Sequence, residues 1–272
     1  MYNILASLRS ANELHDTMIT SVDLSSVITS GGAQTTPVLE NEVYGLTSTL
    51  IIVKQGLPFQ LDGLYNGDSR ILIIVSGDGE LTDVTGWHTS ISALKTIALE
   101  PGSRAGCTLT ASDSNSIQLL ELIVKSLPDD VTAAADAAAR KALPFALDYK
   151  DASTYSESFK SAKTISRTLI PKGIIPRFAA GSVQVSGPDA VGEHSHPMLE
   201  QYFLGLPGCN AIVKANGETA KLCAWTLLHI PLGSTHGVTV DEENDLHYIW
   251  IDLFRNLEGE AWLDGHVDNK PQ

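Results

Sequence analysis

Three histidines and one glutamate in the C-terminal half are spaced as the ligands of a single metal ion. His194 and His196 are two residues apart, Glu200 follows them, and His236 ends the segment PLGSTH. Neutral imidazole nitrogen and carboxylate oxygen together suit Zn, Mn, Fe, Ni or Co better than Mg or Ca. We therefore expect His194, His196, Glu200 and His236 to bind one divalent transition metal ion.

Two β-strands are needed to bring these side chains together. Side chains alternate between the faces of a strand, so His194 and His196 point the same way. Glu200 and Tyr202 join them if that strand continues, and His236 must then arrive from a second strand. Tyr202 is the candidate proton donor on the ligand face, and Glu200 is the candidate base if it leaves the metal.

Both segments resemble the motifs of the cupin superfamily, whose members are small antiparallel β-barrels. The first motif is Gly, then His-x-His, three residues and Glu, and residues 192–200 match it. The second motif is Pro-x-Gly-x-x-His, which residues 231–236 match. The chain departs from the family pattern at Pro207, Trp225 and Val240, none of which is an expected ligand. This resemblance covers residues 165–255 and implies a metal-binding barrel there.

Short apolar runs dominate the chain, and they predict the strands of such barrels. Runs bounded by Gly, Pro, Asp or Ser occur at 50–53, 71–75, 117–124 and 248–254. The alanine-rich segment 131–143 predicts a helix between the two halves.

We therefore predict an all-β protein with two cupin-like antiparallel β-barrels of the jelly-roll type, joined by a short helical linker. The predicted parts are an N-terminal arm, a degenerate barrel, a linker with the helix and a metal-binding barrel, over residues 1–39, 40–127, 128–164 and 165–272.

The first barrel is predicted to bind no metal. Laying the second half over the first puts Leu64, Asn66, Arg70 and Ala105 at the four ligand positions. None of these side chains is a usual ligand of a transition metal. An unrelated β-sandwich is the alternative for this half.

The C-terminal half also resembles the 5-keto-4-deoxyuronate isomerase branch of the cupins. The similar residues include Arg167, Tyr202, Trp250 and the pair His266-Val267, although that branch has one more residue between the His-x-His pair and the Glu. This resemblance implies a metal-dependent enzyme for a small oxygen-rich molecule. The reaction would be isomerase or lyase chemistry at a metal-bound carbonyl or enediolate.

Two alternatives stay open at this point. One is an Fe(II)-dependent dioxygenase with an aromatic pocket formed by Phe203, Trp225, Tyr248 and Trp250. The other is a non-catalytic small-molecule-binding cupin. His229 and His247 lie in apolar runs, which favours structural roles for them over catalytic ones.

Composition limits the partners. Net charge is −14, with 43% hydrophobic and 18% charged residues, which is typical of a globular protein and argues against nucleic acid or an anionic membrane as partner. No apolar stretch has the length of a membrane span, and the N-terminus lacks the pattern of a signal peptide. Scattered Cys107, Cys209 and Cys223 favour a reducing compartment. We expect a cytoplasmic homodimer, because barrel edges are commonly covered by pairing.

Overall fold

The protein is built almost entirely of antiparallel β-strands, which confirms the predicted fold class. The structure is a computed structural model, and it describes residues 18–29, 34–64, 67–99, 106–112, 115–128, 130, 142–157 and 160–261. Most of the predicted helix at 131–143 lies outside the described residues. Helical structure is limited in the described part to α2 (Leu24–Thr29), η1 (Tyr149–Asp151) and helical residues at 128, 130 and 257–261.

Two sheets form the N-terminal half. The larger contains β2 (Thr35–Pro37), β3 (Leu46–Val53), β5 (Ser69–Ser76), β8 (Thr96–Leu99), β10 (Ile117–Val124) and β11 (Phe145–Leu147). The smaller contains β4 (Pro58–Leu61), β6 (Gly79–Asp83), β7 (His88–Ile91) and β9 (Cys107–Ala111). Their strand orders are β11-β8-β5-β10-β3-β2 and β4-β9-β6-β7. The predicted apolar runs therefore become the central strands β3, β5 and β10.

The C-terminal half repeats this plan. Its larger sheet contains β1 (Thr20–Asp23), β12 (Thr154–Tyr155), β13 (Ile165–Ile175), β14 (Phe178–Ser186), β16 (Leu199–Gly205), β19 (Thr226–Ile230) and β21 (Asp245–Phe254). The smaller contains β15 (Asp189–Ser195), β17 (Asn210–Ala215), β18 (Glu218–Cys223) and β20 (Thr235–Val240). Their orders are β1-β19-β16-β21-β14-β13-β12 and β15-β20-β17-β18.

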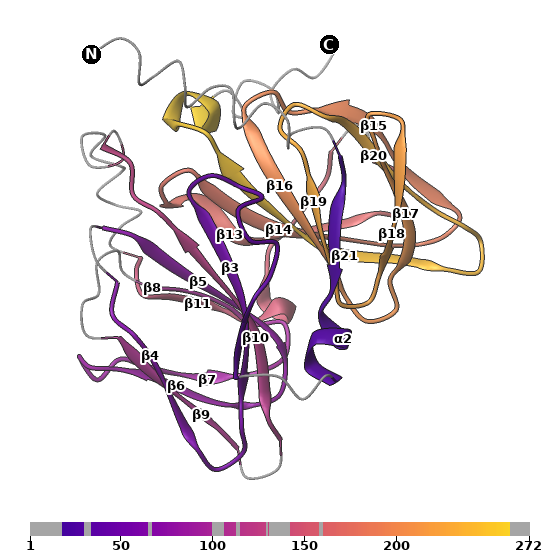
Figure 1. Cartoon of the computed structure of the whole chain (residues 1–272). Coiled ribbons are helices and arrows are strands. Elements are labelled where there is room, and N and C mark those ends of the chain that lie inside the picture. The colour runs from indigo at the N-terminus through magenta and orange to yellow at the C-terminus, as the bar shows by residue number, and fades with distance from the viewer. Residues whose placement is uncertain are drawn as a thin grey trace.

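Strands from the expected arm and linker connect the two halves. β1 pairs with β19, so the indigo strand lies among the orange strands of the C-terminal half (Figure 1). β11, from the expected linker, pairs with β8 of the N-terminal half, and β12 pairs with β13. The described strands of both segments are therefore parts of the sheets.

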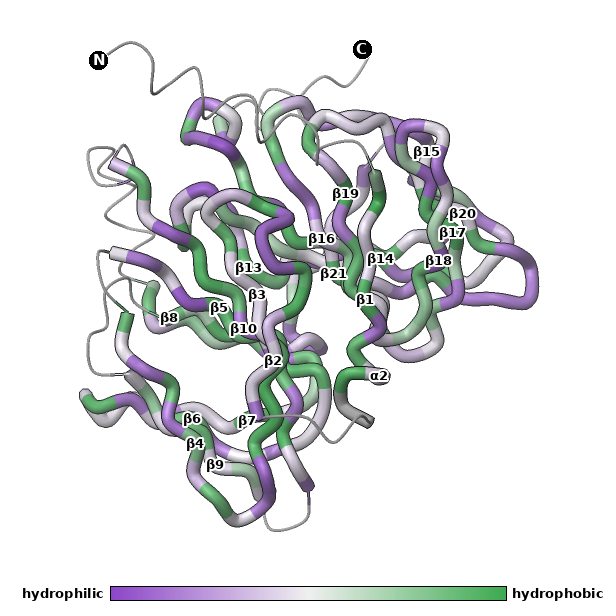
Figure 2. Tube along the Cα trace, viewed as in Figure 1, coloured by the Kyte–Doolittle hydropathy of each residue, from purple (hydrophilic) through white to green (hydrophobic). Residues whose placement is uncertain are grey.

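Three large buried clusters hold the sheets together in the described part of the chain. One fills the space between the sheets of the N-terminal half, and one fills the C-terminal half. The third joins the two larger sheets to each other, with Ile71, Ile73 and Leu120 on one side and Leu169, Tyr202 and Ile251 on the other. Apolar residues accordingly colour long stretches of β3, β5 and β10 green (Figure 2). The larger sheet of each half is thus covered on both faces.

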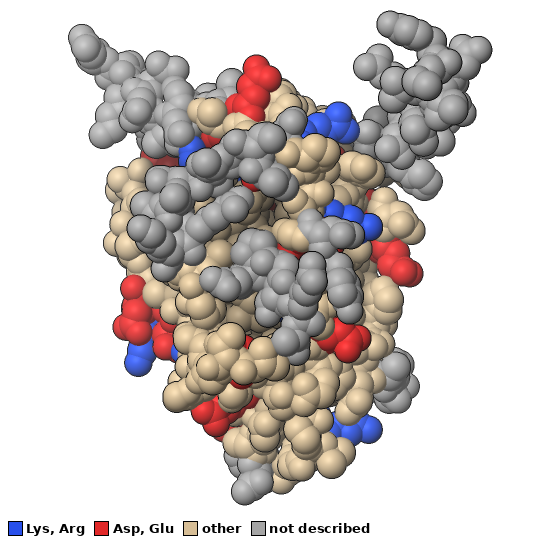
Figure 3. All heavy atoms as spheres, turned by 90° about the vertical axis from the view of Figure 1, so that its left-hand side faces the viewer, with Lys and Arg blue, Asp and Glu red and all other residues tan. Residues whose placement is uncertain are grey.

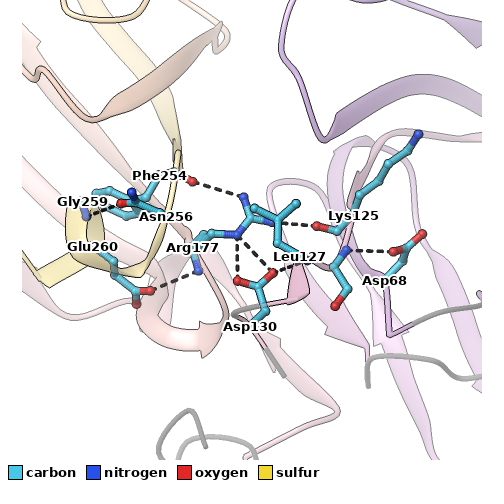
Figure 4. Close-up of polar contacts among 10 residues, drawn as sticks. Asp68, Lys125, Leu127, Asp130, Arg177, Phe254, Asn256, Gly259 and Glu260 are labelled. Atoms are coloured by element: carbon cyan, nitrogen blue, oxygen red, sulfur yellow. Dashed lines mark hydrogen bonds and ion pairs between the residues drawn. The ribbon is translucent and has the colours of Figure 1, made fainter. Parts of the chain in front are cut away.

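Arg177 ties the two halves together through a buried polar network (Figure 4). Its Nε donates to both carboxylate oxygens of Asp130, at 2.9 and 3.1 Å. The guanidinium also donates to the carbonyl oxygens of Phe254 at 3.2 Å and Lys125 at 2.6 Å, and the Arg177 backbone N–H donates to Glu260 at 3.1 Å. One side chain therefore bonds the end of β10, the residues after it and the end of β21.

The structure describes two of the four positions that the sequence comparison identified in the N-terminal half, Leu64 and Arg70. Arg70 is buried and its Nε donates to Glu121 at 2.7 Å, and Leu64 is also buried. Asn66 and Ala105 lie outside the described residues. Burial raises the pKa of Glu121, whereas Arg70 lowers it. An ion pair therefore occupies this part of the half.

One face of the molecule carries dispersed charged side chains (Figure 3). On the face drawn in Figure 3, the described Asp, Glu, Lys and Arg residues stand singly or in small groups among uncharged ones. Within the described part of the chain, no helix is both long and apolar enough to cross a membrane.

Candidate metal centre

His194 and His236 lie opposite each other on two paired strands. β15 and β20 are antiparallel neighbours, and their register pairs His194 with His236 after an irregularity that follows Val191. His196 comes directly after β15. A turn with Gly233 at a φ of 69° leads into β20, a conformation that glycine adopts readily. The local sequence thus brings all three histidines to one end of this strand pair.

The three imidazoles form one cluster, as the sequence predicted. Each has a ring nitrogen within 4.8 Å of a ring nitrogen of the others, and the cluster is the group of potential metal ligands found among the described residues. Ring centroids of His194 lie 4.8 Å from His196 and 4.6 Å from His236. Such a cluster matches the imidazole ligands of a transition metal site.

Backbone carbonyls orient two of the rings. His194 Nδ1 donates to Gly192 O at 2.8 Å, and His236 Nδ1 donates to Ser234 O at 3.1 Å. A carbonyl oxygen only accepts hydrogen bonds, so each Nδ1 carries the proton that it donates. Bonds of this kind commonly fix the tautomer of metal-bound histidines.

The electrostatic environment favours the neutral imidazole. Burial, and then the neighbouring His194, lower the pKa of His236 to about 4. His236 is therefore uncharged at neutral pH, which is the state that binds a metal ion. The donor set accordingly fits a divalent transition metal.

A cavity of about 350 Å³ adjoins the three histidines. Apolar side chains form much of its wall, including Val191, Phe203 and Val238. The remaining wall is polar or aromatic: Tyr155, Ser156, Glu157, Lys160, Thr168, Lys172, Gln201, Tyr248, Trp250 and Asp252, with Ile170 and Ala179 between them. A volume of this size suits a small molecule.

Charged groups of both signs line this cavity. Lys160 forms an ion pair with Glu157 and donates to Ser166 Oγ at 3.2 Å, and Lys172 donates to Glu260 O at 3.1 Å. Burial raises the pKa of Asp252 to about 7, although a hydrogen bond from Gln201 acts in the opposite direction. Burial also raises the pKa of Tyr155.

Glu200 and Tyr202 lie elsewhere, contrary to the expectation that they share the ligand face. β15 ends at Ser195, residues 197–198 form a turn, and β16 begins at Leu199 in the other sheet. The alternation of side chains therefore starts afresh at Leu199. As a result Gln201 and Phe203 line the cavity, whereas Tyr202 lies in the core between the larger sheets.

Glu200 belongs to a separate polar cluster. Its Oε2 lies 3.1 Å from His229 Nε2, and His229 Nδ1 lies 3.3 Å from Glu42 Oε2. Glu42 Oε2 also accepts a hydrogen bond from Thr20 Oγ1 at 2.9 Å. Glu200 and Glu42 both line a second cavity, away from the three histidines. His229 is thus a buried link between the C-terminal sheet and the N-terminal segments.

His247 lies outside the histidine cavity as well. Its Nε2 is 2.8 Å from the Tyr149 hydroxyl, which also accepts hydrogen bonds from Arg167 and Ser182. Burial lowers the pKa of His247, and Arg167 adds to this effect. Of the expected aromatic pocket, Phe203, Tyr248 and Trp250 line the cavity, and Trp225 packs against the central core instead.

Several cavity residues were not expected from the sequence. Tyr155, Glu157 and Lys160 come from the segment interpreted as a linker, and Lys172 comes from β13. Gln201 and Asp252 are adjacent on β16 and β21. The sequence contained one signal for Gln201. The isomerase branch has one more residue between the His-x-His pair and the acidic ligand, and that spacing places the fourth ligand at position 201 instead of 200.

Comparison with known proteins identifies the fold. No protein-family model and no curated protein sequence matches this chain. Among solved structures, salicylate 1,2-dioxygenase from Pseudaminobacter salicylatoxidans superposes with a TM-score of 0.66 at 9% identity, over 91% of this chain and 87% of that one. Oxalate decarboxylase from Lactobacillus farciminis gives 0.58 at 16% identity, over 82% and 81%.

A cupin 2 conserved barrel domain protein from Leptotrichia buccalis gives a TM-score of 0.58 at 14% identity, over 87% of this chain and 96% of that one. The matches extend over both halves, because each covers more than four fifths of the chain. These likenesses, together with the antiparallel sheets, show that the chain has the cupin fold.

Proposed function

We propose that this protein is a metal-dependent cupin enzyme in which His194, His196 and His236 hold one divalent transition metal ion. The convergence of the three imidazoles on one cavity carries the proposal. Nδ1 of His194 and Nδ1 of His236 each donate to a backbone carbonyl oxygen, a contact that commonly orients histidines at metal sites. Zn, Mn, Fe, Ni and Co are the candidate ions, because imidazole nitrogen suits each of them.

The reaction that this cavity supports best is isomerase or lyase chemistry on a small oxygen-rich molecule. A bound metal would supply a Lewis acid for a substrate carbonyl. Lys172 offers positive charge for a carboxylate group, and Val191, Phe203 and Val238 make one wall of the cavity apolar. Tyr155 and Asp252 offer groups that exchange protons beside the same space, as proton transfer next to a carbonyl requires.

Metal analysis and one substitution test the proposal. Protein purified without a nickel column should contain about one transition metal ion per chain. His196→Ala should reduce the metal content well below that value and abolish activity towards small keto and hydroxy acids. His88→Ala is the matched control, because His88 is exposed in the N-terminal half, and it should keep the metal. Full metal retention in His196→Ala would refute the assignment.

An Fe(II)-dependent dioxygenase is the second candidate. The aromatic side chains of Phe203, Tyr248 and Trp250 around the cavity favour it. Oxygen uptake separates the two reactions, since isomerase or lyase turnover continues in an anaerobic assay and dioxygenase turnover stops. Tight binding of a small acid without any turnover would instead favour a non-catalytic binding protein.

We further propose a homodimer, because a sheet edge left unpaired in one chain can be covered by a second copy. Light scattering at micromolar concentration tests this directly. A monomeric mass would contradict it.

A further inference from the structure

Gln201 shares the cavity of the three histidines and is hydrogen-bonded to Asp252. It is on β16 and 7% exposed, and it lines the same cavity as His194, His196 and His236. Its Nε2 donates a hydrogen bond to Asp252 Oδ1 at 2.9 Å. Its Oε1 is buried and has no hydrogen-bond partner in the described part of the structure.

The hydrogen bond between the two residues shows which end of the amide faces Asp252. The amide nitrogen of Gln201 is the donor to Asp252 Oδ1, so the nitrogen end of the amide faces Asp252. The carbonyl oxygen is then directed away from Asp252. A buried carbonyl without a partner lowers the stability of the fold, which indicates that a ligand of this oxygen completes the site.

We propose that Gln201 provides the fourth protein ligand of the metal through Oε1, and that Asp252 is the positioning residue that holds the amide in this orientation. The proposal rests on the proposed function, because it requires the three histidines to bind a metal ion. It assigns to Gln201 the role that the sequence suggested for Glu200. Amide oxygen is a weaker donor than carboxylate, but metals that accept oxygen ligands also bind it.

The proposed ligand set has a chemical consequence for the substrate. Three neutral imidazoles and one neutral amide leave the full positive charge of the ion uncompensated by its direct ligands. A site with this charge inside a buried cavity favours an anionic oxygen group on the incoming molecule. The substrate group that we expect at the metal is therefore a carboxylate or an enolate oxygen.

Co²⁺ binding to the metal-depleted full-length protein tests the assignment of Gln201. Its visible absorption changes with the number and type of ligands, and titration gives the dissociation constant without any assay of turnover. Gln201→Ala should weaken binding by about 10-fold or more and change the spectrum. Gln118→Ala is the matched control, because Gln118 is a half-buried glutamine in the N-terminal half that bonds Ser76, and it should change neither.

Asp252 needs its own pair of variants. Asp252→Ala removes the acceptor for the Gln201 amide and should weaken Co²⁺ binding by roughly 10-fold. Asp252→Asn keeps an oxygen that accepts the same hydrogen bond, so it should restore most of the affinity. A purely structural role would instead lower the thermal stability of Asp252→Ala and leave the Co²⁺ spectrum and affinity unchanged.

The outcomes separate this inference from the proposed function. If the wild-type protein binds no Co²⁺, or binds it equally well after His196→Ala, the metal centre itself is wrong. If binding depends on His196 while Gln201→Ala keeps both spectrum and affinity, the metal centre stands and the role of Gln201 is refuted. Should Gln201→Ala fail to fold, the nearly isosteric Gln201→Glu decides, since a carboxylate at the metal must alter the spectrum and an unchanged spectrum overturns the inference.

Discussion

Substitution of Glu200 tests whether this residue belongs to the buried cluster with His229, as the structure places it, or to the metal ligands, as its spacing in the sequence suggested. Glu200 Oε2 lies 3.1 Å from His229 Nε2, with side-chain exposures of 10% and 1%. A hydrogen bond to a charged group contributes about 1.5–3 kcal/mol to stability when it is buried. Glu200→Ala should therefore lower the free energy of unfolding by about 2–3 kcal/mol, since His229 loses one of its two carboxylate partners.

The metal content of Glu200→Ala should equal that of the wild-type protein, because Glu200 lies outside the histidine cluster. Glu193→Ala is a matched control from the residue directly before His194. Glu193 pairs with Lys214 at 2.6 Å, but both side chains are 48% exposed, and exposed pairs contribute at most about 1 kcal/mol. Urea denaturation measures stability and elemental analysis measures the metal. If Glu200→Ala loses its metal and keeps its stability, Glu200 is a ligand and the reasoning is wrong.

Three further predictions follow from other buried and half-buried residues. Arg177→Met should destabilise the protein by about 3–5 kcal/mol in urea denaturation, because it leaves the buried carboxylate of Asp130 without its cation; a loss below about 1 kcal/mol would contradict a buried network. Tyr202→Phe should leave turnover and metal content unchanged, because the ring lies in the core between the larger sheets; a large loss of turnover would return Tyr202 to the active site. The lowered pKa of His247 means that the unfolded chain takes up a proton first as the pH falls below about 6.5. Stability should therefore fall with pH in this range, and His247→Gln should make the fall shallower.

The sequence was sufficient for features that depend on short segments. The His-x-His pair, the Pro-Leu-Gly turn and His236 each lie within one strand or one turn, and pairing of β15 with β20 brings His194 opposite His236. Apolar runs identified β3, β5, β10 and β21 because central strands of a covered sheet are apolar on both faces. These local patterns fix the fold class and the three imidazoles.

Residues that reach the cavity from distant segments could not be predicted in this way. Tyr155 and Lys160 precede β13, and no periodicity indicates which cavity they line. Asp252 lies in a strand whose other residues are mostly apolar, and the sequence does not show which residue forms a hydrogen bond with its carboxylate. Its role becomes visible only once the register of β16 and β21 pairs Gln201 with Asp252. Such contacts depend on tertiary structure, which the sequence pattern does not contain.

Glu200 lies away from the histidines because the strand that carries it is not a continuation of β15. Alternation predicts side-chain direction only within one continuous strand, and the turn at Pro197 and Met198 moves the chain from the smaller sheet to the larger one. From Leu199 onward, Gln201 and Phe203 face the cavity, whereas Tyr202 and Leu204 lie in the core shared with the N-terminal half.

One face of β16 therefore lines the cavity of the candidate metal centre, and its other face packs between the two halves. Tyr202 and Leu204 are buried against the larger sheet of the N-terminal half, so that half covers the back of the strand that carries Gln201. Close packing of this kind holds a strand in position and transmits changes in side-chain volume. Because the N-terminal half packs against the back of β16, substitutions that enlarge Leu204 should disturb Gln201 before they disturb the histidines on β15 and β20.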